Sequence, residues 1–259
     1  MSAENPYSPP AATVKDVVEP SVAGGFLPEG RKVDAGRGLA WITEAFSMVF
    51  AAPGNWVLLW LAMFVILLIL GMIPLLGIVS YVLTPVLMAG VIHAAARQDS
   101  GDTFEVGDLF AGFREKFGPL ALSGLLFVVA ATVIGGGLAL ILGFTVFASL
   151  MGGGSTAIAR NLGIIIIAMP LILVVIMAIY SLVWFAPALI LRHDFQPVDA
   201  MKLSMKVTLR NWAAVLVYGI AAFVVVLIAA IPFGLGLLIA GPALLVSFYT
   251  AYRDLFLAR

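Results

Sequence analysis

Cysteine is absent from the 259-residue sequence, which excludes disulfide bonds, a thiolate nucleophile and metal sites built on cysteine ligands. Histidine occurs only twice, too rarely for a zinc site of the usual composition. Charged residues make up 11% of the chain, against about a quarter of an ordinary soluble domain. The 14 basic residues balance the 14 acidic ones, so the overall charge does not favour a nucleic-acid partner.

Apolar residues are correspondingly abundant. They make up 63% of the chain, and the mean hydropathy is +1.13. A soluble fold of this length cannot bury that excess, because its surface must stay polar enough to remain dispersed in water. The alternative solvent for these side chains is lipid, so the composition predicts a membrane protein.

Residues 1–36 differ in kind from the rest of the chain. They carry five prolines and many small residues, and they contain no apolar run long enough for the core of a signal peptide. Such a composition cannot bury enough apolar surface to fold. We predict a disordered cytoplasmic tail over residues 1–36 and a transmembrane domain over residues 37–259.

A long uncharged tract, residues 55–96, indicates how the membrane domain is organised. As one helix it would span roughly 60 Å, about twice the thickness of the hydrocarbon core. The chain must therefore fold back, and the helix breakers Gly71, Pro74 and Gly77 stand where one crossing is complete. The dipeptides Asn-Trp and Ile-Pro recur at similar intervals over residues 211–236, which predicts a second hairpin of the same kind.

Apolar length predicts an all-α polytopic membrane protein with six transmembrane helices arranged as three hairpins. The expected spans are residues 54–73, 78–97, 118–142, 162–186, 211–231 and 235–253. A longer, polar and glycine-rich connection joins the third and fourth spans, and the glycine run Gly135–Gly137 in the third span is expected to permit close helix packing or a kink.

A short amphipathic helix is expected before each hairpin, at the membrane interface. The three segments are residues 39–50, 106–117 and 201–210. The last alternates polar and apolar residues like a strand, but an isolated strand at a membrane surface would leave its backbone unpaired, so we predict a helix. Its apolar stripe would comprise Val198, Met201, Met205, Leu209 and Trp212.

The basic residues are distributed unevenly between the two sides that these spans define. One side holds 13 of the 14 lysines and arginines, and the other holds only Arg160. Positive residues are retained on the cytoplasmic side of a membrane. The asymmetry therefore predicts that both termini are cytoplasmic.

Several short motifs resemble an uncharacterised family of proteobacterial six-span inner-membrane proteins. They are "LAWITEAF" near the start of the domain, "DLFAGF" at 108–113, the paired Pro-Gly hairpins and the closing "YTAYRDLF". The resemblance covers residues 37–259. It implies a multi-pass protein of the bacterial inner membrane, and it implies no activity, because the family has none established.

Chemistry-bearing residues are scarce inside the expected spans. No ionisable residue stands in the middle of a span, and His93 lies one helical turn before Arg97, near the interface. No serine lies in a G-x-S-x-G motif. Prolines within spans could free backbone carbonyls to bind a neutral group or a cation, although ordinary kinks explain them as well. These prolines are Pro85, Pro170 and Pro242.

One candidate binding site remains, a basic stripe of Lys202, Lys206 and Arg210 that would face lipid headgroups. We predict a protein without catalytic residues, metal or cofactor that interacts with the lipid bilayer, anionic phospholipid included, or with other membrane proteins. A homo-oligomer and the physiological role stay open. The alternative is a transporter or channel for a neutral or apolar solute, which would need a polar cavity at mid-membrane.

Overall fold

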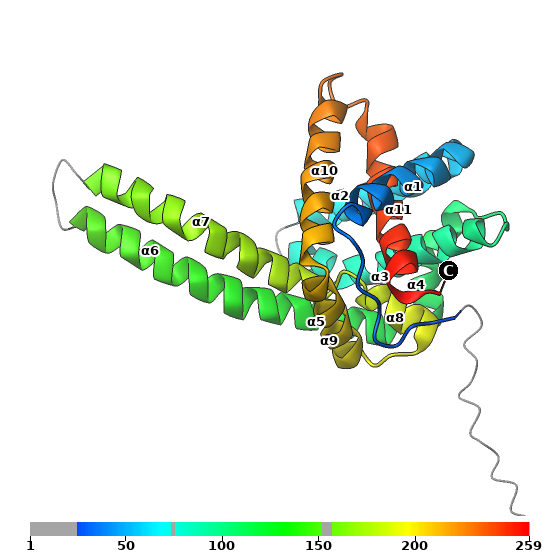
Figure 1. Cartoon of the computed structure of the whole chain (residues 1–259), viewed down its shortest axis with the longest axis horizontal. Coiled ribbons are helices and arrows are strands. Elements are labelled where there is room, and N and C mark those ends of the chain that lie inside the picture. Colours follow the sequence, from blue (N-terminus) through cyan, green and yellow to red (C-terminus); the bar gives the residue numbers. More distant parts are fainter. Residues whose placement is uncertain (1–24, 74–75, 152–156, 259) are drawn as a thin grey trace, which may run out of the picture.

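The computed structural model describes residues 25–73, 76–151 and 157–258, and these residues form an all-helical protein (Figure 1). Within them, the sole extended pairing is an isolated bridge between Phe26 and Leu257. The all-α prediction is confirmed. In chain order the helical elements are α1 (Arg37–Ala51), α2 (Pro53–Met72), α3 (Leu76–Asp99), the 3₁₀ turn η1 (Val106–Phe110), α4 (Ala111–Glu115), α5 (Phe117–Ala130), the π-helical turn η2 (Ala131–Gly135), α6 (Gly136–Met151), α7 (Ala157–Ser181), α8 (Ala186–His193), α9 (Pro197–Arg210), α10 (Trp212–Ala230) and α11 (Leu237–Phe256).

Five helical segments of the described chain are long and apolar enough to cross a membrane. They coincide with the first five spans expected from the sequence, because a run of apolar residues at 1.5 Å per residue fixes both the helix and its reach. The third segment joins α5, η2 and α6, and the fourth joins α7 and α8. The five are Pro53–Met72, Leu76–Asp99, Phe117–Ser149, Asn161–His193 and Trp212–Ala230.

The sixth expected span corresponds to α11, which is not among these five segments. Its last turns carry Arg253 and Asp254, and α1, α2, α3 and α10 pack around it. Twelve of its twenty residues are buried. A helix at the centre of a bundle meets protein more than lipid, so it can carry polar residues that a lipid-facing helix cannot.

The helix boundaries beside the predicted reversals lie where the prolines and glycines stand. At the first, α2 ends at Met72 and α3 starts at Leu76. The second lies between α10 and α11, where Phe233 and Gly234 have φ angles of 52° and 80°. Two consecutive residues with positive φ angles interrupt a right-handed helix and turn the chain. Glycine adopts a positive φ angle without a steric cost.

The repeated asparagines have matching roles in the structure. Asn55, near the start of α2, donates from Nδ2 to the carbonyl of Phe104 at 2.7 Å. Asn211, just before α10, donates from Nδ2 to the carbonyl of Arg31 at 3.0 Å. Each amide therefore ties the start of an apolar helix to a distant segment, which gives the internal repeat a physical basis.

Close helix approach occurs at glycines other than the run Gly135–Gly137. At that run an added Cβ would meet no described atom within 4 Å, and the π-helical turn η2 ends there instead. At Gly90 in α3 an added Cβ would lie 1.9 Å from the carbonyl oxygen of Leu109, and at Gly38 in α1 it would lie 2.0 Å from that of Ala214. Glycine at these two positions lets the backbones of neighbouring elements touch.

The first two amphipathic segments differ from the single interfacial helices that the sequence predicts. The first is a helix, α1, but its apolar face packs against α10 and α11, so that Trp41, Ala45 and Val49 are fully buried in protein. The second divides into η1 and α4, and both pack against α3. Tertiary contacts therefore use apolar faces that the sequence alone assigned to the membrane interface.

The third segment is the helix α9, as predicted. Of its expected apolar stripe Met201 is buried, beside Ala200 and Ser204, whereas Val198 and Trp212 are exposed. Ser204 Oγ donates to the carbonyl of Ser181 at 2.6 Å and accepts from the amide of Phe185 at 3.0 Å. This face carries small residues because it packs directly against the backbone between α7 and α8.

The helices α6 and α7 run side by side and project to one side of the remaining helices (Figure 1). Their outer faces are almost entirely apolar. The side chains of Leu140 and Ile167, for example, are 76% and 81% exposed. Water is a poor solvent for a surface of this kind, so these faces fit a lipid environment.

Residues 25–31, which belong to the stretch predicted as a tail, are hydrogen-bonded to the end of the last helix. The amide of Leu27 donates to the carbonyl of Phe256 at 2.7 Å, and the amide of Arg31 donates to that of Leu255 at 2.8 Å. The Phe26 ring stacks on that of His193 at a centroid distance of 3.7 Å. We call residues 25–31 the N-terminal strap. Residues 1–24 of the predicted tail lie outside the described part of the chain.

Candidate functional site

The structure places two of the three residues of the predicted basic stripe against the N-terminal strap. Lys202, Lys206 and Arg210 lie on α9, as expected, but Lys206 pairs with Glu29. Arg210 donates from Nη2 to the carbonyl oxygens of Gly30 at 2.6 Å and Glu29 at 3.1 Å. The hydrogen bond and charge of Lys206 hold the pKa of the Glu29 carboxyl below its usual range. Acidic and carbonyl oxygens of the chain itself thus occupy part of this candidate lipid-headgroup site.

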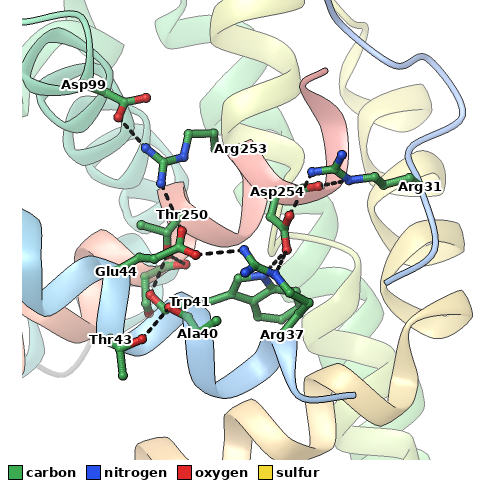
Figure 2. A network of polar contacts seen from close by, with 11 residues as sticks. Arg31, Arg37, Ala40, Trp41, Thr43, Glu44, Asp99, Thr250, Arg253 and Asp254 are labelled. Carbon is green, nitrogen blue, oxygen red and sulfur yellow. Dashed lines mark hydrogen bonds and ion pairs between the residues drawn. The ribbon is translucent and has the colours of Figure 1, made fainter. Parts of the chain in front are cut away.

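A second polar cluster lies beside the strap and joins α1, α3 and α11 (Figure 2). Its centre is Asp254, whose residue is only 4% exposed. The carboxylate accepts from Arg31 Nη2 at 2.8 Å, from Arg37 Nε at 2.7 Å and from the indole Nε1 of Trp41 at 2.9 Å. We call these residues, with those in the next paragraph, the arginine–carboxylate network.

Glu44 and Asp99 extend the network along α11. Glu44 accepts from Arg37 Nη2 at 2.8 Å and from Arg253 Nη2 at 3.0 Å. Arg253 also pairs with Asp99, which accepts the hydroxyl of Tyr249 at 2.8 Å. Three guanidinium groups therefore meet three carboxylates, and the cluster is charge-balanced.

The network is suited to holding helices together. A cavity of about 340 Å³ lies beside it, but its arginines and acids are already engaged with one another. Burial alone would lower the pKa of Arg37, but the hydrogen bonds to Asp254 and Glu44 raise it above its usual value. The guanidinium stays charged, as a permanent partner of these acids must.

Both histidines contact other protein groups. His93 on α3 lies 3.7 Å from Glu115 and 4.0 Å from Asp108. His193 Nε2 lies 2.5 Å from the hydroxyl oxygen of Tyr252. Among the described residues, no group of three or more histidines and acids could hold a metal ion.

An apolar cavity of about 480 Å³ lies between the candidate spans. The sequence did not reveal it, because its walls come from six segments that are far apart in the chain. The three prolines within spans do not meet there, since of Pro85, Pro170 and Pro242 only Pro85 is in the wall. The lining residues are Met63, Tyr81, Thr84, Pro85, Met88, Phe127, Tyr180, Val183, Trp184, Pro187, Tyr218, Leu245 and Phe248.

The few polar groups of this wall are largely satisfied by the protein. The hydroxyls of Tyr218 and Ser247 lie 2.8 Å apart, and Thr84 Oγ1 donates to the carbonyl of Ser80 at 2.8 Å. The indole nitrogen of Trp184 is buried and has no hydrogen-bond partner among the described residues. The cavity can therefore hold an apolar molecule, and it offers little to a polar solute.

Comparison with known proteins identifies a family and a relative. A family model described as "Domain of unknown function (DUF7847)" matches residues 45–252, which is most of the chain. A Burkholderia thailandensis protein named "Probable inner membrane protein" is 28% identical over 258 residues, covering 87% of this chain and 93% of that protein. No solved structure matches.

Proposed function

The chain belongs to the family described as "Domain of unknown function (DUF7847)", and from this premise we propose that it is a non-catalytic component of the bacterial inner membrane that interacts with lipid or with other membrane proteins. The family and the relative's name confirm the resemblance predicted from the sequence. The observation that carries the proposal is the apolar outer surface of the candidate spans, as at Leu140 and Ile167.

The proposed topology has six crossings as three hairpins, with both ends in the cytoplasm. The pairing of residues 25–31 with residues 255–257 supports an even number of crossings, because paired segments lie on the same side. The five candidate spans need one more crossing to meet this condition, and α11 is the remaining apolar helix of 20 residues. The 13-to-1 division of basic residues supports the cytoplasmic side.

The engagement of the acids supports a non-catalytic role. Asp254 and Glu44 accept from arginines within the network, and Asp108 accepts from Arg97 at 3.0 Å and from the amide of Glu105 at 2.9 Å. Carboxylates held in this way fix helix ends and loops. A general base would instead need room to take up a proton from a bound substrate.

The topology is tested by cysteine labelling, for which the absence of natural cysteine is an advantage. Thr103→Cys, in the exposed loop after α3, should react with a membrane-impermeant maleimide only in inside-out vesicles. Ser155→Cys, on the opposite side by sequence, should react only in right-side-out vesicles. Labelling of both cysteines from the same side would contradict the topology, and the unsubstituted chain serves as the blank.

The basic stripe gives a second test, on lipid binding. We propose that it binds anionic headgroups and that the strap covers part of it. Lys202→Gln combined with Lys206→Gln should lower the phosphatidylglycerol and cardiolipin that co-purify, roughly fivefold for each charge removed. Glu29→Gln should raise this lipid, because it releases Lys206. Mass spectrometry of the extracted lipid measures both changes.

The matched control for Glu29→Gln is Asp102→Asn, which removes one acidic charge from an exposed loop away from the stripe. Its lipid content should equal that of the unsubstituted protein. Equal lipid content in all these variants would show that the basic residues serve only to orient the chain in the membrane.

A transporter for an apolar solute is the second candidate function, favoured by the cavity of about 480 Å³. The apolar wall argues against a polar or charged cargo. A transporter must also expose this cavity to each side in turn, whereas a lipid-interacting component needs it open only toward the bilayer.

A further inference from the structure

The apolar cavity lies within the membrane-spanning part of the chain, on the topology proposed above. Met63 follows the start of α2 by ten residues, which is about 15 Å of helix and half of a crossing. Tyr218 lies only six residues into α10, and Trp184 follows the end of α7 by three. Tyr81 lies five residues after the start of α3, on the other side of the membrane, so the cavity extends from near the cytoplasmic boundary past the middle of the bilayer.

The wall of the cavity suits a flexible hydrocarbon chain. Aromatic rings form much of it, with Trp184 at centroid distances of 5.2 Å from Tyr218 and 5.8 Å from Phe248. Met63 and Met88 add thioethers, which adapt to chains of variable shape. Since Tyr218 and Ser247 bond to each other, the wall requires no hydrogen bonds from a ligand over most of its length.

The cavity is large and opens toward the bilayer. Its volume of about 480 Å³ lies in the range of about 300 to 1,000 Å³ that is usual for ligand sites. Tyr81 and Tyr180 belong to the wall and are also 54% and 56% exposed, so they mark its opening on the outer surface. An empty space of this size would forfeit the contacts of its lining, and the medium at its opening is lipid.

We propose that this cavity binds one acyl chain of a phospholipid from the cytoplasmic leaflet. The chain enters between Tyr81 and Tyr180, and its methyl end lies toward Met63. Its ester end lies near Trp184, where a carbonyl oxygen could satisfy the buried indole N–H after a small rotation of the ring. The inference rests on the proposed membrane location of these helices and deepens it by naming the lipid contact.

Photocrosslinking tests the proposal on the full chain in nanodiscs. The probe is phosphatidylglycerol with a diazirine in the middle of one acyl chain, and a diazirine-bearing free fatty acid is the second arm. With the phospholipid probe we expect adducts on wall residues such as Met63, Met88 and Phe127, mapped by peptide mass spectrometry.

Filling the cavity should remove these adducts. Val183→Trp is expected to lower wall adducts about fivefold or more, because its ring occupies the space of the chain. Val174→Trp, on the exposed face of α7, is the matched control and should leave them unchanged. Leu245→Trp fills the cavity from α11, so that a folding failure of one variant is covered by the other.

The outcomes separate the proposal from its rivals. Unchanged wall adducts in a folded, filled variant would overturn it, and so would adducts confined to outer faces in the unsubstituted protein. Labelling of the wall by the fatty acid alone would overturn the phospholipid assignment. If cysteines at positions 103 and 155 label as expected but the wall does not, only the acyl-chain site fails; if that labelling fails, the proposed function fails first.

Discussion

Gly90→Ala should leave little folded protein in the membrane. The added Cβ would lie 1.9 Å from the carbonyl oxygen and 2.4 Å from the carbonyl carbon of Leu109. These are backbone atoms, so no side-chain rotation relieves the overlap, and α3 and η1 must separate. We expect a loss of about 3 kcal/mol or more, at the upper end for an overpacked core. The melting temperature in detergent and the monodisperse fraction on size exclusion measure the effect.

Gly71→Ala is the control for this prediction. Gly71 also lies in a helix, α2, but an added Cβ there would meet no described atom within 4 Å. Alanine is the better helix former by about 0.5 to 1 kcal/mol, so this variant should be as stable as the parent or slightly more so. Equal melting temperatures for the two variants would mean that α3 and η1 are not in backbone contact.

Asp254→Ala should be the most damaging single change in the arginine–carboxylate network. It removes the acceptor of the fully buried Trp41 indole and leaves Arg31 and Arg37 without this carboxylate (Figure 2). Removing one partner of a buried ion pair costs about 3 to 5 kcal/mol, and we expect the lower value because both arginines are partly exposed. Thermal unfolding in detergent is again the measurement.

Two further variants show whether charge or shape is responsible. Asp254→Asn keeps an acceptor for Trp41 but removes the charge, so its loss should be smaller than that of Asp254→Ala. Asp102→Ala removes an acid from an exposed loop and should have little effect. If Asp254→Ala were as stable as Asp102→Ala, the network would not hold α11 to α1.

The helices were predictable from the sequence because their cause is local. An apolar run of the right length, bounded by residues such as Pro74 and Gly77, fixes a crossing without knowledge of its neighbours. The segment α11 shows the limit of this reasoning. Its apolar length predicts a span, but its polar end is explained only by the acids and arginines of α1 and α3 that surround it.

The faces of the shorter helices were not predictable in the same way. Of the bulky apolar stripe of α9 Met201 is buried, and the rest of the buried face includes the small residues Ala200 and Ser204. This face depends on the carbonyl of Ser181 and the amide of Phe185, which only the folded chain brings to α9. Periodicity identifies a helix, and the partner decides which side is covered.

The candidate sites show the same division. The basic stripe is visible in the sequence because its members are spaced four residues apart on one helix. Its cover is not visible, because Glu29 belongs to a segment whose prolines and small residues indicate disorder. The apolar cavity is less visible still, since wall residues such as Met63, Phe127 and Tyr218 have nothing in common but their position in space.

The attachment of the strap to the last helix has a consequence for biogenesis. Arg31 leaves the ribosome long before Asp254, its partner 223 positions later, so it must wait for nearly the whole chain to be translated and inserted. Until then the strap has no place to dock. In a nascent or truncated polypeptide the strap would therefore stay undocked and accessible to proteases. Protection of the strap from proteolysis would indicate that the last helix has been inserted.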